Sequence, residues 1–362
     1  MEHKLQRREF LKLASLAVVG IAAAPPVLRR PLPALVQGTG ARFGRVAIDY
    51  GFVRARPGQD GRIVGKVLRD DVVPIVREVV GKGLHPSNHI WFELPDGYIY
   101  STAMQVVRNE PNESLRSLPA DGLFGEVTVP FADARSEPNP SAVTPYRVYY
   151  SAVFQVYGVQ QAPDGSYWLR VKDDADVKLW LPAHILRPLT QADIAPISPH
   201  ADGKLIVVNL ARQSMSAFEG ANEVFRTLVS TGKHYVKDGQ WVDAQSTPVI
   251  TAPLWSKRIT RHMQGGSATA GWDIPGVPFV SFFSSNGAAV HGAFWHNHFG
   301  QPRSAGCINC TPEAARWIFR WTLPKVDYLP GFADSPWPGV SRSNHKTLAR
   351  IVWLAAVRRR IW

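Results

Sequence analysis

Short runs of β-branched and aromatic residues, separated by turn residues, recur along most of the chain. Ile90–Leu94 and Tyr98–Tyr100 flank the turn Pro95-Asp96-Gly97. An Asp-Gly pair between two strand-like runs is a strong hairpin signal. Glycine and proline number 29 each among 362 residues, which favours short strands and loops over long helices. The sequence therefore predicts a mainly β chain.

Length and composition allow more than one folded unit. At roughly 150 residues per domain, the chain has room for two or three domains. Hydrophobic residues make up 45% and charged residues 19%, so buried cores are feasible and wholesale disorder is excluded. The chain has no apolar run of about 18 residues, which excludes a membrane protein with several spanning helices.

The net charge of +12 is concentrated at the two ends of the chain. Residues 1–30 hold six basic and two acidic side chains, and residues 325–362 hold seven basic and two acidic ones. The long middle segment therefore has only a small positive excess. A composition of this kind predicts no nucleic-acid partner.

Residues 1–30 have the features of an export signal or membrane anchor. Arg7 and Arg8 precede the apolar run Leu13–Ala24, which is too short to span a bilayer comfortably as a helix. The two arginines followed by Phe10 resemble a twin-arginine signal, which implies export of an already folded chain. An ordinary secretory signal and a buried N-terminal helix are the alternatives.

Pro25 and Pro26 are poor neighbours for a cleavage site, so an uncleaved membrane anchor stays open. Residues 31–41 have the proline and glycine content of a linker. We therefore expect an extracytoplasmic protein, in the cell wall or periplasm, that is either released or membrane-anchored.

Two small β units are expected at residues 42–110 and 121–190, and they form a weak repeat. Ala55-Arg56 is echoed by Ala134-Arg135, and Trp91 by Trp168. The opening Val53–Pro57 and the tryptophan followed by a hairpin resemble bacterial SH3-like domains. That resemblance implies binding of cell-wall polymer, or simple spacing of the rest of the chain from a membrane.

A proline-rich segment at Arg187–Pro199 suggests a second linker, and a larger β unit is expected after it, at residues 202–325. Its expected strands lie at Lys204–Leu210, Met215–Phe218, Val224–Val229, Thr247–Leu254, Phe279–Ser285 and Ala288–Val290.

A helix is expected to begin after Thr311, with Thr311 as N-cap, Pro312 at the first helical position and Glu313 in the first turn. Cys307 would then lie on a loop just ahead of a helix N-terminus. Such a position, together with a neighbouring imidazole, lowers the pKa of a thiol.

Cys307 and His291 together suggest acyl transfer. Gly306 allows a close backbone approach and leaves amide groups free for an oxyanion, while His291 at a strand end is a candidate base. From the residues alone, a buried structural cysteine with surface histidines explains the pattern equally well.

His291-Gly292, eleven intervening residues, and Ser304-x-Gly306-Cys307-Ile308-Asn309 closely resemble the L,D-transpeptidase (YkuD-type) catalytic domain. The resemblance covers about residues 202–325. It implies a β-sandwich domain that cross-links the stem peptides of peptidoglycan, with no metal or organic cofactor. Monomer is the default expectation.

The resemblance also implies a role for each matching residue. Cys307 is the nucleophile and His291 the proton acceptor and donor. The Gly292 carbonyl orients the imidazole, Ser304 supports the loop, and the amides of Gly306 and Cys307 form the oxyanion hole. The expected substrate-binding residues are Trp295, His296, Asn297, Arg303 and Asn309.

Two positions depart from the family pattern. Ala305 replaces the usual histidine beside the nucleophile, and we hypothesise that His296 or His298 takes over part of its electrostatic role. Cys310 stands where an aliphatic residue is usual, and we expect it to be a small core residue under the helix.

Other readings of the same residues remain open. Cys307 and Cys310 form a C-x-x-C pair, which suggests a redox site or a reversible disulfide lock. The two cysteines with His291, His296 and His298 could hold zinc. A wall-binding protein without activity is a further alternative. The basic tail, residues 326–362, is either an amphipathic helix on a membrane or a segment packed on the catalytic domain.

Overall fold

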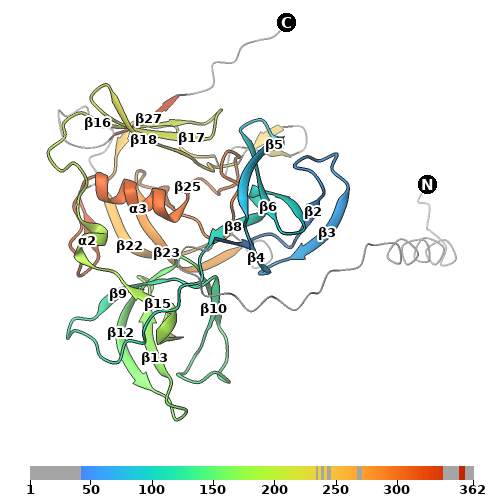
Figure 1. The fold of residues 1–362 in the computed structure, drawn as a ribbon. Helices are drawn as coiled ribbons and strands as arrows, with labels where there is room; N and C mark the ends of the chain where they lie inside the picture. Colours follow the sequence, from blue (N-terminus) through green and yellow to red (C-terminus); the bar gives the residue numbers. More distant parts are fainter. Residues whose placement is uncertain are drawn as a thin grey trace, which may run out of the picture.

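The computed structural model describes residues 42–233, 235–237, 240–242, 246–266, 271–336 and 350–354. The expected signal and linker therefore lie outside the described residues, as does most of the basic tail. Strands dominate the described part, so the mainly β prediction is confirmed (Figure 1). Within that part, no helix has the length and apolar character needed to cross a membrane.

The first unit spans residues 43–107, and its first and last strands are paired. The first strand, β1, pairs antiparallel with both β4 and the last strand, β8. The predicted hairpin is confirmed: Leu94 pairs with Gly97, whose φ of +148° suits glycine. The elements are β1 (Phe43–Val46), β2 (Tyr50–Arg54), β3 (Ile63–Leu68), β4 (Val72–Pro74), β5 (Arg77–His85), β6 (Asn88–Leu94), β7 (Gly97–Tyr100), the 3-10 turn η1 (Ser101–Ala103) and β8 (Met104–Val107).

The second unit spans residues 123–188 and has a similar order of elements with one strand fewer. Its first and last strands pair antiparallel, and a 3-10 turn again precedes the last strand. Trp91 in β6 and Trp168 in β13 occupy corresponding strands. The elements are β9 (Leu123–Val127), β10 (Phe131–Ala134), β11 (Tyr146–Tyr149), β12 (Val153–Gln161), β13 (Tyr167–Lys172), β14 (Leu179–Pro182), η2 (Ala183–Ile185) and β15 (Leu186–Pro188). The SH3-like assignment of both units stays a prediction.

The third unit consists of two five-stranded sheets, and its core contains residues of both sheets and of the helix α3. The sheet orders are β18-β17-β16-β27-β21 and β25-β24-β23-β22-β26, and a separate hairpin joins β19 to β20. The elements are β16 (Lys204–Asn209), β17 (Ser214–Glu219), β18 (Asn222–Leu228), β19 (Tyr235–Lys237), β20 (Gln240–Val242), β21 (Ala252–Pro253), β22 (Ser256–Gly265), β23 (Trp272–Phe282), β24 (Ala289–Gly292), β25 (Ile308–Cys310), α3 (Pro312–Trp321), β26 (Phe332–Asp334) and β27 (Arg350–Leu354).

Two predictions for the third unit are corrected. The expected strand at Thr247–Leu254 shrinks to the two residues of β21. In the tail, residues 350–354 form the strand β27, which pairs parallel with β16, and not an amphipathic helix. The reason is that β-branched residues such as Ile351 and Val352 suit a strand, and β16 offers backbone partners. The described residues of the tail thus join the third unit, in agreement with the alternative expectation for that part.

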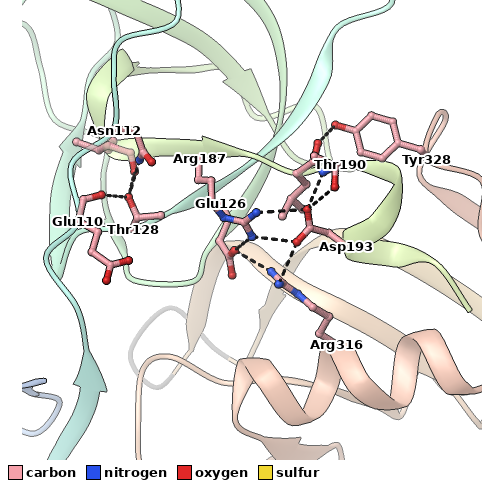
Figure 2. A network of polar contacts seen from close by, with 11 residues as sticks. Glu110, Asn112, Glu126, Thr128, Arg187, Thr190, Asp193, Arg316 and Tyr328 are labelled. Atoms are coloured by element: carbon pink, nitrogen blue, oxygen red, sulfur yellow. Dashed lines mark hydrogen bonds and ion pairs between the residues drawn. The ribbon is translucent and has the colours of Figure 1, made fainter. Parts of the chain in front are cut away.

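The segment Arg187–Pro199 is not a free linker, because ion pairs fix it to the third unit. It contains the short helix α2 (Gln191–Ile194), which is capped by Thr190 and Asp193. Arg187 lies 2.6 Å from Glu126 and 3.2 Å from Asp193, and Arg316 of α3 lies 2.7 Å from Glu126 (Figure 2). The guanidinium groups of Arg187 and Arg316 thus both pair with Glu126 and Asp193, and these ion pairs connect the second unit, α2 and α3.

The second unit also docks on β22 and β23 of the third unit. Thr260 donates a hydrogen bond of 2.5 Å to the carbonyl of Val153. Gly276, at φ +72°, lies so close to the ring of Phe154 that a Cβ there would come within 2.5 Å of it. The contact between the two units therefore depends on a glycine that leaves room for an aromatic ring.

Candidate active site

The pairing of β24 with β25 brings the predicted nucleophile and base to one place. The two strands are parallel, with His291 opposite Asn309 and Val290 opposite Ile308. Because side chains alternate along a strand, Cys307 and Asn309 face one side of β25 and Ile308 and Cys310 the other. Accordingly Cys307, Asn309 and His291 line one cavity, while Ile308 and Cys310 belong to the core.

His291 is oriented by the backbone of the next residue. Its Nδ1 lies 3.1 Å from the Gly292 carbonyl, which can only accept, so Nδ1 carries the proton and Nε2 is left with its lone pair. Trp295 stacks on the imidazole with ring centres 5.7 Å apart. The side chain is fully buried, and burial lowers the pKa of His291 to about 4. His291 is therefore a neutral base at neutral pH.

The pKa of the Cys307 thiol is raised and not lowered, contrary to the prediction from the sequence. The helix does begin as predicted, with the Thr311 hydroxyl accepting from the Ala314 amide, but β25 separates Cys307 from that N-terminus. Burial raises the pKa of the Cys307 thiol, although a hydrogen bond with the Ala289 backbone acts in the opposite direction. The resting pair is therefore a neutral thiol and a neutral imidazole, not an ion pair.

Ser304 and Gly306 shape the loop before the nucleophile. The Ser304 hydroxyl donates to the Cys307 carbonyl at 2.5 Å and accepts from the Gly306 amide at 3.1 Å. Gly306 has φ +119°, a conformation that favours glycine. The Gly306 amide is therefore engaged within the loop and is not free for an oxyanion in this structure. An oxyanion contact of the Cys307 amide stays a prediction.

His296 fixes Asn309 but supplies no charge. Its Nε2 lies 2.8 Å from the Asn309 side-chain amide, and its Nδ1 accepts from the His298 backbone at 3.2 Å. Burial, with smaller effects of His298 and Arg303, lowers the pKa of His296 to about 3, and burial lowers that of His298 to about 4. Both rings are neutral at neutral pH and supply no positive charge beside Cys307, so the hypothesis that His296 or His298 takes over part of the electrostatic role of the histidine replaced by Ala305 stays a prediction.

The active-site cavity has a volume of about 530 Å³. Of the predicted residues, it is lined by His291, Trp295, His296, Arg303, Ser304, Cys307 and Asn309. Asn297 is not among the lining residues, since its amide donates at 2.8 Å to the carbonyl of Ser101 in the first unit. In this structure Asn297 therefore forms a contact between units, and its role in substrate binding stays a prediction.

Sequence reasoning missed a large part of this cavity. The first unit contributes Ala47, Ile48, Asp49 and Arg69, and the third unit adds Lys233, Met263, Trp272 and Ile274. Lys233 directly follows Ser230-Thr231-Gly232, a run of small and polar residues typical of a loop, and that run could have indicated it as a candidate site residue. No motif indicated the contribution of the first unit, because it depends on how two separate folds dock.

The geometry gives little support to a redox pair of cysteines or to a metal site. Both cysteines are free, and Cys310 is fully buried with its thiol 3.5 Å from the His291 carbonyl. The expectation that Cys310 is a core residue under the helix is confirmed, and its position on the opposite face of β25 disfavours a disulfide with Cys307. Among the described residues, no three His, Cys, Asp or Glu side chains are grouped to hold a metal.

The pKa of His291 predicts an unusual pH profile for acylation of Cys307. Since only the neutral imidazole accepts the proton, kcat/KM should stay constant down to about pH 5 and decrease at about pH 4. With an unperturbed histidine, kcat/KM would already decrease near pH ~6.5. The rate should be measured from about pH 3.5 to 8, with thermal unfolding followed in the same buffers to separate acid unfolding. An acid limb near pH ~6.5 would contradict the assignment.

A neutral histidine on β24 and a cysteine directly before β25 line one cavity of a β domain, an arrangement suited to acyl transfer by a cysteine. Residues 203–330 match the family model described as the L,D-transpeptidase catalytic domain, YkuD. This part of the chain is thus a YkuD L,D-transpeptidase catalytic domain.

Solved structures of similar proteins include several L,D-transpeptidases. A C442S mutant L,D-transpeptidase of Enterococcus faecium is 16% identical, with 42% of this chain and 49% of that chain covered and a TM-score of 0.30. An L,D-transpeptidase from Mycobacterium smegmatis is 16% identical over 78% of this chain and 99% of that one, with a TM-score of 0.31. L,D-transpeptidase 3 from Mycobacterium tuberculosis is 14% identical over 52% and 68%, with a TM-score of 0.30.

The chain spans about half the length of the first structures it matches, 49% in each. A comparison with curated proteins gives no match. The family assignment therefore rests on the sequence match of residues 203–330.

Proposed function

We propose that this protein is an exported cysteine L,D-transpeptidase that acts on the stem peptides of peptidoglycan. The observation that carries the proposal is the meeting of Cys307 and His291 at one cavity, with the His291 Nε2 left free by the Nδ1 contact to Gly292. The match of residues 203–330 to the family supports the same reaction class.

In the first half-reaction, the Cys307 sulfur attacks the carbonyl carbon of the third residue of a stem tetrapeptide. Because the resting thiol is neutral, its proton passes to His291 Nε2 as the carbon–sulfur bond forms. The bond to the terminal D-Ala breaks, and His291 returns the proton to the leaving amine. A thioester on Cys307 and a free D-Ala result.

In the second half-reaction, an amine of a neighbouring stem attacks the thioester carbonyl. His291 takes a proton from the amine and gives it to the departing sulfur, so the amide bond forms and the thiol is restored. Water in place of the amine would give hydrolysis. Both steps place negative charge on the carbonyl oxygen, where the Cys307 amide is the proposed donor.

Export and wall binding are further parts of this proposal. Arg7, Arg8 and the apolar run Leu13–Ala24 support export, and an uncleaved N-terminus would attach the protein to the membrane. The similar order of strands in the first and second units supports two related modules, for which cell-wall polymer is the proposed ligand.

The function is tested by incubating the full chain with a stem tetrapeptide and an amine acceptor, and following the products by chromatography and mass spectrometry. Release of D-Ala together with a new amide to the acceptor is expected. The Cys310→Ala variant should keep this activity, because Cys310 lies in the core on the other face of β25. Absence of both products from the unmodified protein would reject the proposal.

A further inference from the structure

The first unit forms one wall of the active-site cavity. Its loop between β1 and β2 contributes Ala47, Ile48 and Asp49, and Arg69 follows β3. The Arg69 amide donates to the Asp49 carbonyl at 3.0 Å, and the Ala47 amide to the Ala103 carbonyl at 2.9 Å. These backbone bonds hold the wall in a fixed shape beside the nucleophile.

The charges around the cavity favour an anionic ligand. Three cationic side chains line it: Arg69 from the first unit, and Lys233 and Arg303 from the third. Among the lining residues that the structure describes, Asp49 is the one carboxylate. The lining histidines are neutral at neutral pH, so they do not alter this balance.

Arg69 retains donors for a ligand. Its Nε and Nη2 reach the same Asp49 oxygen at 3.2 and 2.7 Å, and its Nη1 reaches the Ala47 carbonyl at 3.4 Å. A guanidinium has five N–H donors, so about two remain. The side chain is 50% exposed and that of Asp49 is 86% exposed. An exposed ion pair of this kind contributes little stability, and its main effect is that Asp49 orients the Arg69 guanidinium.

We propose that the first unit is part of the substrate site and that Arg69, held by Asp49, binds a carboxylate of the stem peptide. The proposal rests on the proposed function, because it names how that substrate is recognised. Its chemistry is the pairing of a guanidinium with a carboxylate, for which arginine geometry is well suited. The carboxylate is either the terminal one of the leaving residue or an internal one.

The test measures binding by calorimetry, in the full chain with Cys307→Ala so that no acylation occurs. The probe is a stem tetrapeptide with free carboxylates. Adding Arg69→Ala should weaken binding about tenfold, as expected for the loss of one charge-assisted contact. Arg69→Lys should restore part of the affinity. The matched control is Arg62→Ala, since Arg62 is an exposed arginine of the same unit that does not line the cavity.

Two amidated peptides identify the carboxylate. One is amidated at its terminal carboxylate and the other at its internal carboxylates. The peptide that lacks the carboxylate bound by Arg69 should bind with equal affinity to the Cys307→Ala protein and to the same protein with Arg69→Ala. The proposal is overturned if Arg69→Ala does not weaken binding of the free peptide, or if the loss is the same for both amidated peptides. No binding by Cys307→Ala alone would instead reject the substrate class, and this proposal with it.

Discussion

Replacement of His291 by glutamine is expected to slow acylation of Cys307 by about a thousandfold, within the range known for loss of a general base. Glutamine is similar in size, but it does not take up the thiol proton. The effect should be large because the thiol has a raised pKa and is not ionised at rest. Single-turnover acylation, measured by mass spectrometry, gives the rate directly.

The matched control for this experiment is His298→Gln. His298 lines the same cavity and is also neutral, but it has no place in the proposed proton transfer. Its replacement should change the rate by no more than about threefold, a small effect beside that of a lost general base. Equal losses in the two variants would show that the cavity needs its imidazoles for shape, and that His291 is not the base.

Arg45→Met is expected to lower kcat strongly, although Arg45 belongs to the first unit. Its buried guanidinium donates to the Phe294 carbonyl at 2.6 Å and is held by Asp70 at 2.8 Å and Gln105 at 2.9 Å. Phe294 precedes Trp295, which stacks on His291. Arg45 is thus a positioning residue, and its loss should lower kcat about tenfold to a hundredfold with little change in KM.

The same variant should lose about 3–5 kcal/mol of unfolding free energy, because Asp70 would be left without its buried partner. Arg147→Met is the control: Arg147 also pairs with Asp70, at 3.1 Å, but it is 39% exposed and makes no contact with Phe294 among the described hydrogen bonds. It should be nearly neutral in both measurements.

Where Arg45→Met proves too unstable to assay, Asn297→Ala tests the same idea. It removes the hydrogen bond from Asn297 to the Ser101 carbonyl, which is another contact between the first unit and this loop. A fall in kcat of about tenfold in a folded protein is expected. A normal kcat in both variants would mean that the first unit does not position the catalytic loop.

Local patterns in the sequence predicted most of the elements, and the resemblance to the L,D-transpeptidase family singled out His291 and Cys307. The hairpin at Pro95-Asp96-Gly97, the helix start at Thr311 and the spacing from His291 to Cys307 are each encoded within a short segment. Turn chemistry, helix capping and the order of side-chain types along a short segment are local, so the sequence alone predicts them.

Properties that depend on burial and docking could not be predicted in this way. The pKa values of Cys307 and His291 follow from burial of the site. Arg45 and Arg69 gain their proposed roles only when the first unit docks beside the loop that holds Phe294. The residues 350–354 suited both a helix and a strand, and the edge offered by β16 decided between them.

The central claim is that Cys307 is the acylated nucleophile, and intact-mass spectrometry tests it most directly. After incubation with a disaccharide-tetrapeptide, the protein should gain the mass of the substrate without its terminal residue. The adduct should persist in Cys310→Ala and be absent in Cys307→Ala. The account would be contradicted if D-Ala were released while the mass of the protein stayed unchanged throughout the reaction. It would also be contradicted if the Cys307→Ala variant still formed the adduct.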